Sequence, residues 1–151
     1  MTGKALLNYT TKVAPSKTAG EVQAILAKAG AKAIGTEYED GEPVALHFVI
    51  ATVHGDAGFL LPINVEPVAE VLERQVRQGK INTRHGRPNP KAVAWRIVKD
   101  WIEAQLAIIE TEMVTLDQVM LPYRRTSDGT PLYKAVESGA LDRVLALGAG
   151  S

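Results

Sequence analysis

Hydrophobic and polar positions change period several times along this chain, and the changes predict where strands and helices begin and end. Residues 8–13 carry Tyr, Thr and Val in a pattern typical of a half-buried first strand. Hydrophobic residues then recur at helical spacing from Val22 to Ala29. Ser16 or Thr18 can cap this helix, and Gly30 follows it where a left-handed residue commonly ends a helix.

Two further runs predict a β-hairpin. Residues 31–38 and 44–52 flank the pair Asp40-Gly41, which readily adopts the positive φ angles of a tight turn. A further strand is expected over residues 58–63, after a turn at residues 55–57. The large apolar residues expected to share one face of the second run are Leu46, Phe48 and Ile50.

Helical spacing returns in the middle of the chain. Asn64 can cap a helix whose hydrophobic residues run from Val68 to Val76, and this helix leads into a strongly basic segment. Asn89 and Pro90 then begin the longest element, because Asn is a good N-cap and Pro is tolerated at the first helical position. We expect this helix to reach about Met113.

The long helix carries a hydrophobic arc over more than half of its circumference, and an arc this wide needs cover from two sides. Its polar face is narrow, and there Arg96 with Asp100 and Lys99 with Glu103 are spaced to form i,i+4 ion pairs. The residues of the arc are Trp95, Ile97, Val98, Trp101, Ile102, Leu106, Ile108 and Ile109.

The C-terminal part is expected to contain only short helices. Residues 115–118 have the form of a capping box, and the helix that they begin should end at residues 121–123. Residues 124–131 have the composition of a turn, and residues 132–147 are weakly helical.

The order of elements predicts an α+β fold. A small, mainly antiparallel sheet in the order β-α-β-β-β-α is followed by the long helix and the short C-terminal helices. We expect one domain over residues 1–136 and a weakly helical or disordered tail over residues 137–151.

Composition narrows the class of protein. The 151 residues are 46% hydrophobic and 23% charged, which is typical of a soluble globular domain. The chain has no Cys, which excludes disulfides, thiol nucleophiles and Cys-ligated zinc. No apolar run approaches the ~18 residues of a membrane helix, and the N-terminal apolar stretch is too short for a signal peptide. We therefore expect a cytoplasmic protein without membrane association.

Charge is balanced over the chain but not along it. Seventeen basic and seventeen acidic residues give a net charge of zero, yet residues 74–99 hold eight of the bases and no acid. Such a segment can follow a sugar-phosphate backbone without reading its sequence, or it can be a solvated loop without a partner. Since two of the eight bases should pair within the long helix, the predicted phosphate contacts are Arg74, Arg77, Lys80, Arg84, Arg87 and Lys91.

Aromatic residues bear on the choice between single and double strands, because unpaired bases stack on exposed rings. Trp95 lies at the centre of the hydrophobic arc and is expected in the core. The predicted stacking residues are Tyr9, Trp101 and Tyr123, although a packed ring is the alternative for each.

Catalytic and metal-binding patterns are weak. His54 and Asp56 could supply two metal ligands, but a surface turn is the simpler interpretation of that segment. The acidic hairpin around residues 37–42 could hold Mg²⁺ for a nuclease or phosphodiesterase, and this hypothesis ranks last. We predict no catalytic residue, no metal site and no cofactor.

Several segments resemble a group of small phage and prophage proteins. They are the run VAWRIVKDWIEAQLAIIE at residues 93–110, Met113, the Leu-Pro-Tyr at 121–123, the turn at 128–133, and the stretches at 8–13 and 59–63. The similarity reaches about Tyr133, and the residues from about Glu137 onward lie outside it. That group tends to accompany replication and recombination genes, which implies a single-stranded-DNA-binding or annealing accessory in the cytoplasm of a bacterial host cell and brings no catalytic motif.

These observations together predict a non-enzymatic, sequence-nonspecific single-stranded-DNA-binding protein, with RNA as an alternative ligand. We expect a homo-oligomer, because repeated copies of the basic segment would multiply the phosphate contacts. The alternative is a protein-interaction module, such as an inhibitor of a host enzyme or a recombinase loader. That hypothesis rests on the wide hydrophobic arc of the long helix.

Overall fold

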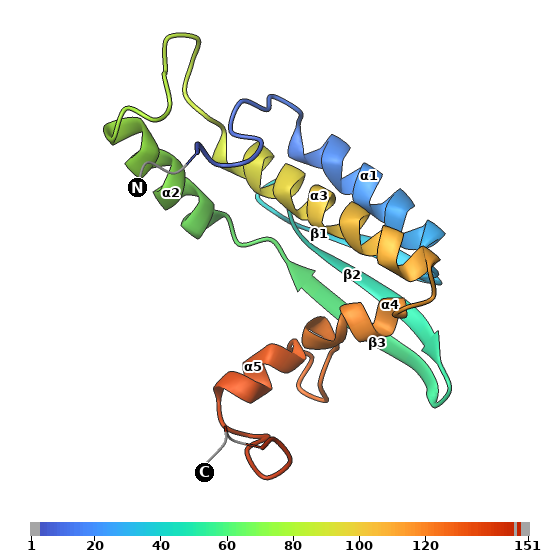
Figure 1. The fold of residues 1–151 in the computed structure, drawn as a ribbon. Coiled ribbons are helices and arrows are strands. Elements are labelled where there is room, and N and C mark those ends of the chain that lie inside the picture. The colour runs from blue at the N-terminus through green and yellow to red at the C-terminus, as the bar shows by residue number, and fades with distance from the viewer. Residues whose placement is uncertain (1–3, 147, 149–151) are drawn as a thin grey trace.

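The computed structural model describes residues 4–146 and residue 148 of the chain. Within them the chain forms one α+β domain, in which a single three-stranded antiparallel sheet is packed against helices (Figure 1). The predicted fold class is confirmed. The strand order is β1-β2-β3, so each strand is adjacent to the next one in the sequence.

The sheet is a meander of two tight hairpins. Strands β1 (Ala33–Glu39) and β2 (Glu42–Thr52) are joined by Asp40 and Gly41, whose φ angles are +51° and +79°. The predicted turn is confirmed, since both residues adopt the positive φ that a two-residue hairpin loop requires. Strand β3 (Gly55–Pro62) begins three residues earlier than expected, because residues 53–54 make the turn.

Two helices lie side by side on one face of the sheet, α1 (Pro15–Lys28) and α3 (Pro90–Glu110) (Figure 1). Between them and the strands lies the main core. Phe48 and Phe59 stack with ring centroids 5.3 Å apart, and Leu46 and Ile50 are buried on the same face, as predicted. We define the main core as Ala19, Val22, Leu26, Leu46, Phe48, Ile50, Ala57, Phe59, Leu61, Ile63, Ala94, Trp95, Ile102, Leu116 and Met120.

Helix α3 begins as the sequence predicts. The side chain of Asn89 accepts a hydrogen bond from the N–H of Ala92 at 3.2 Å. Trp95 is fully buried and its indole Nε1 donates to the carbonyl of Pro43 at 3.1 Å, so its predicted place in the core is confirmed. The helix ends at Glu110, short of Met113, and the φ of Glu112 is +63°.

Helix α2 (Val65–Arg77) extends beyond the sheet and packs against α3 (Figure 1). Three buried side chains, Leu72, Ile81 and Val93, form a separate contact there, which we call the small cluster. Partly buried apolar side chains surround it: Ala5, Leu6, Tyr9, Val68, Val76 and Ile97.

The C-terminal elements are short, as predicted. Thr115 and Gln118 form the expected capping box at the start of α4 (Leu116–Val119), and the 3₁₀ helix η1 (Leu121–Tyr123) follows. Helix α5 (Leu132–Glu137) ends beside the predicted start of the tail at residue 137. Residues 138–145 form turns and a bend, while the predicted disorder of the last residues falls mostly outside the described part of the chain.

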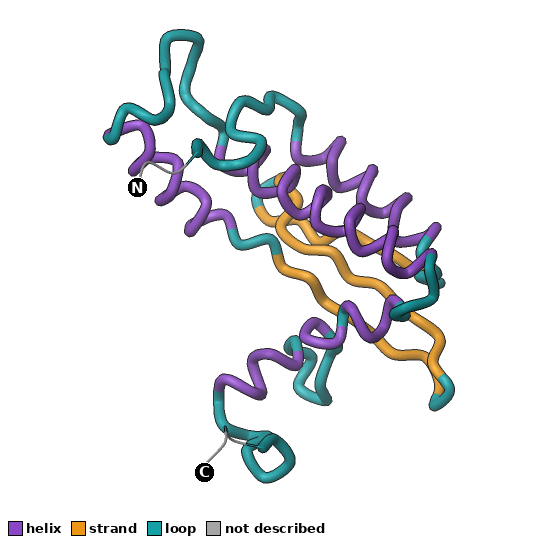
Figure 2. The backbone as a smooth tube through the Cα atoms, viewed as in Figure 1, coloured by secondary structure: helices purple, strands orange, loops and turns teal. Residues whose placement is uncertain are grey.

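The predicted first strand over residues 8–13 is wrong. Residues 7–10 form turns, Asn8 has a φ of +65°, and the N–H of Tyr9 donates to the carbonyl of Leu6 at 3.1 Å. The segment is drawn as a loop beside the helices and is not part of the sheet (Figure 2). Its apolar residues pack against the small cluster of α2 and α3. Its β-type composition therefore reflects half-burial on a helical surface.

One predicted N-cap is wrong, and a second is confirmed in position only. Helix α1 begins at Pro15, so Ser16 and Thr18 are inside the helix, and Ala14 stands at the cap without a side-chain hydrogen bond. Proline explains the earlier start, because its fixed φ suits the first helical turn. Asn64 does occupy the N-cap of α2, but its side chain makes no capping hydrogen bond.

Candidate nucleic-acid interface

A long loop joins α2 to α3 and projects away from the rest of the molecule (Figures 1 and 2). Its turns are local. Gly79 and Gly86 have φ angles of +75° and +112°, the N–H of Arg84 donates to the side chain of Asn82 at 2.8 Å, and the N–H of Gly86 donates to the carbonyl of Thr83 at 3.0 Å. The loop, residues 78–89, is called the basic loop below.

The first residues of the basic loop are anchored to the fold, whereas its tip is exposed. Ile81 is only 3% exposed and belongs to the small cluster, and its N–H and that of Lys80 both point to the carbonyl of Gln75, at 3.3 and 2.9 Å. Residues 84–87, at the tip of the loop, are all exposed. One buried side chain therefore fixes where the loop leaves the fold.

The predicted phosphate contacts have no acidic partner within 4 Å among the described residues. Arg74 and Arg77 are exposed in the last turn of α2, where positive charge is favourable to the helix dipole. They follow Glu70 and Glu73 by four residues, so the charge of these two acids partly offsets theirs. The three bases of the loop itself are Lys80, Arg84 and Arg87.

Two other bases are neutralised, one of them by an unexpected partner. Lys99 pairs with Glu103 at 2.6 Å, which confirms the prediction. Arg96 pairs with Glu21 of α1 at 2.8 Å and not with Asp100. Asp100 instead accepts a hydrogen bond from the side-chain amide of Asn8 at 2.7 Å. The predicted Arg96–Asp100 pair is wrong because α1 and the N-terminal segment offer closer partners.

The N-terminal segment lies directly against the basic loop. The ammonium of Lys12 donates to the carbonyl of Arg87 at 3.1 Å, and this contact joins residues 75 positions apart. Between the two segments is a cleft of about 290 Å³, close to the lower end of the ~300–1,000 Å³ range of small-molecule sites. It is lined by Tyr9, Thr10, Lys12, Ile81, Asn82, His85, Gly86 and Pro88, and we call it the Tyr9 cleft.

The position of Tyr9 is set by tertiary contacts. The side-chain oxygen of Gln75, a residue only 9% exposed, accepts a hydrogen bond from the N–H of Leu6 at 2.8 Å. Tyr9 then packs against the small cluster on one side and lines the cleft on the other. Of the three predicted stacking residues, Tyr9 is the one that lies beside the basic loop.

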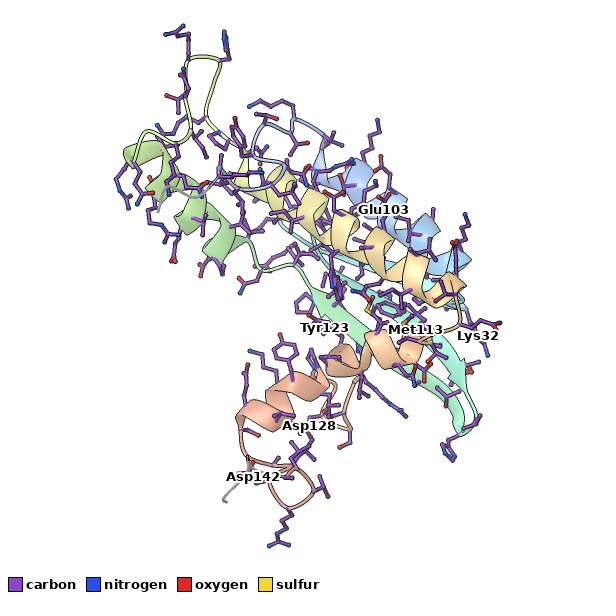
Figure 3. All side chains as sticks on the ribbon, viewed as in Figure 1. Lys32, Glu103, Met113, Tyr123, Asp128 and Asp142 are labelled. Atoms are coloured by element: carbon purple, nitrogen blue, oxygen red, sulfur yellow. The ribbon has the colours of Figure 1, made fainter. Side chains whose placement is uncertain are left out.

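Trp101 and Tyr123 lie elsewhere. Their rings meet edge to face with centroids 6.2 Å apart, and Tyr123 makes a similar contact with Tyr133 at 5.8 Å. Tyr123 lies at η1 near β3, away from the basic loop (Figure 3). Trp101 follows Lys91 by ten residues on α3, about 15 Å along the helix axis. Neither ring is brought together with the predicted phosphate contacts.

Lys91 lines a different cleft from the one beside the basic loop. It forms no ion pair within 4 Å among the described residues, but the other charged residues of its cleft are all acidic and offset part of its charge. They are Glu39, Asp40, Glu42 and Glu66. The acids of this cleft do not form a metal-binding group: no set of three or more metal-ligating side chains converges within the described residues.

His54 lies in the β2–β3 turn, whereas Asp56 belongs to the start of strand β3. The carboxylate of Asp56 is paired with the ammonium of Lys32, just before β1, at 2.7 Å. Both residues are exposed at the end of the hairpin, which agrees with the simpler interpretation of this segment as a surface turn.

Sequence reasoning missed Lys12 and His85 as members of the site. His85 could have been found, because it stands between Arg84 and Arg87 in the segment already identified as basic. Lys12 carried no local signal, since only the folded chain places it against Arg87.

No protein-family model matches this chain, and no curated protein or solved structure is significantly similar to it. The resemblance to phage and prophage proteins therefore stays a prediction. Among the described helices, none combines the length and apolar character that a bilayer crossing requires.

Proposed function

We propose that this chain is a non-enzymatic protein that binds single-stranded DNA with little sequence preference, as an accessory to phage or prophage replication or recombination. One observation carries the proposal. Three bases without an acidic partner in the described chain, Lys80, Arg84 and Arg87, project on an anchored loop beside the Tyr9 cleft.

Local charge supplies the attraction for a polyanion. The net charge of the chain is zero, so its overall field does not draw nucleic acid. The basic loop and Lys12 nevertheless concentrate positive charge at one end of the molecule, and each phosphate that such a group neutralises releases a condensed counterion. Binding of this kind follows the backbone and is sensitive to salt.

The cleft favours a single strand over a duplex. An unpaired base can leave the stack and lie against the ring of Tyr9, with the polar side chains of Asn82 and His85 beside it. Bases of a duplex are already stacked and paired, so placing one in the cleft would cost a few kcal/mol of unstacking energy. A labelled RNA strand distinguishes a general single-strand preference from a preference for DNA.

The test is fluorescence anisotropy of a labelled single-stranded oligonucleotide and its duplex, titrated at several salt concentrations. The variant Arg84→Ala/Arg87→Ala should bind the single strand more weakly. Its plot of log affinity against log salt should be less steep by about 0.7 for each lost phosphate contact. Its stability should not change, because both side chains are exposed.

A matched control removes the same charge from another surface. Lys28→Ala/Arg143→Ala takes away two exposed bases that lie outside the basic loop. This control should keep wild-type affinity and salt slope. Equal losses in both variants would reduce the effect to net charge, and no binding of either probe at low salt would overturn the proposed function.

The alternative of a protein-interaction module rested on an uncovered hydrophobic arc, and the fold does not favour it. The hydrophobic arc of α3 is largely covered by the chain itself, since α1 packs on one side and α2 on the other. Among the described residues, the most exposed member of that arc is Ile108, and that residue is only 38% exposed.

A further inference from the structure

Strand β1 is an open edge of the sheet. It pairs with β2 alone, and no described residue outside β2 makes a hydrogen bond to the backbone of residues 33–39. An edge strand of this kind presents a row of unpaired N–H and C=O groups to any strand that can align with it.

The other edge of the sheet is already partly occupied. The N–H of Arg125 donates to the carbonyl of Gly58 at 2.8 Å, and Phe59 and Arg124 form an isolated antiparallel bridge. A second strand can therefore add on the β1 side far more readily than on the β3 side. Pairing on one side alone gives a closed dimer and not a filament.

Strand β1 is only weakly protected as an edge strand. It holds no Pro and no Lys, its charged residues Glu37 and Glu39 lie in its C-terminal half, and the one irregularity of its pairing with β2 is an extra residue, Val44, on the β2 side. Tyr38 is a large apolar side chain on this edge and is 58% exposed. The outer side of β1 is thus regular enough to be paired over its whole length.

We propose that a second copy of this chain pairs antiparallel with β1 about a two-fold axis at Thr36, which joins two sheets into one of six strands. Side chains alternate between the faces of a strand, so residues opposite each other must belong to the same face. A two-fold axis perpendicular to the sheet must then pass through a residue. Thr36 is the central residue of β1, so this register pairs all seven of its residues.

Charge distinguishes this register from its neighbours. With the axis at Thr36, Tyr38 lies opposite the second copy's Ile34, and neither acid of the strand meets a like charge, because Glu37 lies opposite Gly35 and Glu39 opposite Ala33. Moving the axis to Glu37 would set two carboxylates against each other, and like charges directly opposite are unfavourable. Moving it to Gly35 would shorten the paired length.

The helix beside β1 also leaves room for a neighbour. The side chain of Gln23 bonds Thr36, which shows that this flank of α1 faces β1, whereas Glu21 on the other flank reaches Arg96 of α3. On a helical wheel Ala27 and Gly20 follow Gln23 toward the exterior; both are exposed, and a Cβ placed on Gly20 would meet no atom within 4 Å. Small side chains there allow the second copy's α1 to approach.

The first measurement is the mass in solution by light scattering coupled to size exclusion. The wild-type protein should have twice the 16.2 kDa of one chain. Tyr38→Lys should dissociate the dimer, because it places an ammonium against the second copy's Ile34, and Tyr38→Phe should keep it. Since Tyr38 is exposed in a single chain, neither change should affect folding. A wild-type protein that stays monomeric at all concentrations would overturn the proposal.

The second measurement tests the register. The chain has no cysteine, so a single introduced thiol can form a disulfide only with its copy. In Thr36→Cys the two Cβ atoms would lie ~4.5–5.5 Å apart, close to the ~3.5–4.5 Å that a disulfide needs. Oxidation should therefore give mostly cross-linked dimer.

Tyr38→Cys is the matched control. In the proposed register its two thiols are separated by four residues along antiparallel strands, about 13 Å, and should not cross-link. Chance collisions would instead favour this more exposed position over Thr36. Equal cross-linking of the two variants, or cross-linking of Tyr38→Cys alone, would overturn the register.

Discussion

The main core and the small cluster differ in size and in what they support. The main core contains fifteen buried side chains and joins the sheet to α1, α3 and α4. The small cluster contains three and joins α2, the basic loop and the N-terminal segment to one side of α3. The fold depends on the first cluster, and the candidate binding site depends on the second.

The region around the small cluster is expected to be more dynamic than the sheet. A region held by few buried contacts opens at a lower free energy than the global unfolding of the domain. The basic loop and the Tyr9 cleft are therefore expected to open locally while the sheet stays folded. Such a site can adapt to a flexible strand, and part of the free energy of binding is then spent in ordering it.

The largest effect is expected in the main core. Trp95→Ala removes a fully buried indole and leaves the carbonyl of Pro43 without its donor, which should lower the free energy of unfolding by about 3–5 kcal/mol. Urea unfolding followed by circular dichroism measures this. Trp101→Ala is the matched control, and because that ring is only half-buried its cost should be clearly smaller. Equal costs would contradict the assignment of Trp95 to the centre of the core.

A smaller and local effect is expected in the small cluster. Ile81→Ala removes the side chain that anchors the basic loop, and a buried Ile→Ala change costs about 2–5 kcal/mol. Hydrogen exchange should accelerate in residues 4–12 and 78–89 and change little in β2. Ile108→Ala, at a more exposed position of α3, should leave both regions unchanged. Acceleration throughout the sheet would show that the two clusters unfold as one unit.

The smallest effect concerns the attachment of the N-terminal segment. Gln75→Leu leaves the N–H of Leu6 without its acceptor, which should cost about 1–3 kcal/mol. Hydrogen exchange of residues 4–12 should rise, and affinity for single-stranded DNA should fall because Tyr9 and Lys12 lose their fixed positions. Gln78→Leu, an exposed position one turn along the chain, provides the control. Protected N-terminal amides in Gln75→Leu would show that the small cluster alone holds the segment.

Much of the fold was predictable because its signals are local. The pair Asp40-Gly41, the cap at Asn89 and the capping box at Thr115 each act over two to four residues, and all three are confirmed. The N-terminal strand was not predictable in the same way. Its composition suits any half-buried surface, and the surface that it covers is supplied by α2 and α3, more than fifty residues away.

The candidate site was predictable only in part. The sequence identifies Arg84 and Arg87 because a stretch without acids can be read directly. It does not distinguish Tyr9, which lines the cleft, from Trp101 and Tyr123, which pack with each other. It also assigns Arg96 to the wrong acid, since Glu21 is 75 residues distant and reaches Arg96 only when α1 and α3 are packed.

The sequence by itself therefore determined the Asp40-Gly41 turn, the starts of α3 and α4, the buried face of β2 and the position of the basic loop. These depend on φ preferences, capping and periodicity, which operate between near neighbours. The tertiary structure alone decided the path of the N-terminal segment, the partners of Lys12 and Arg96, and the open edge of β1. Each of these depends on which surfaces meet after packing, and packing joins residues that share no local signal.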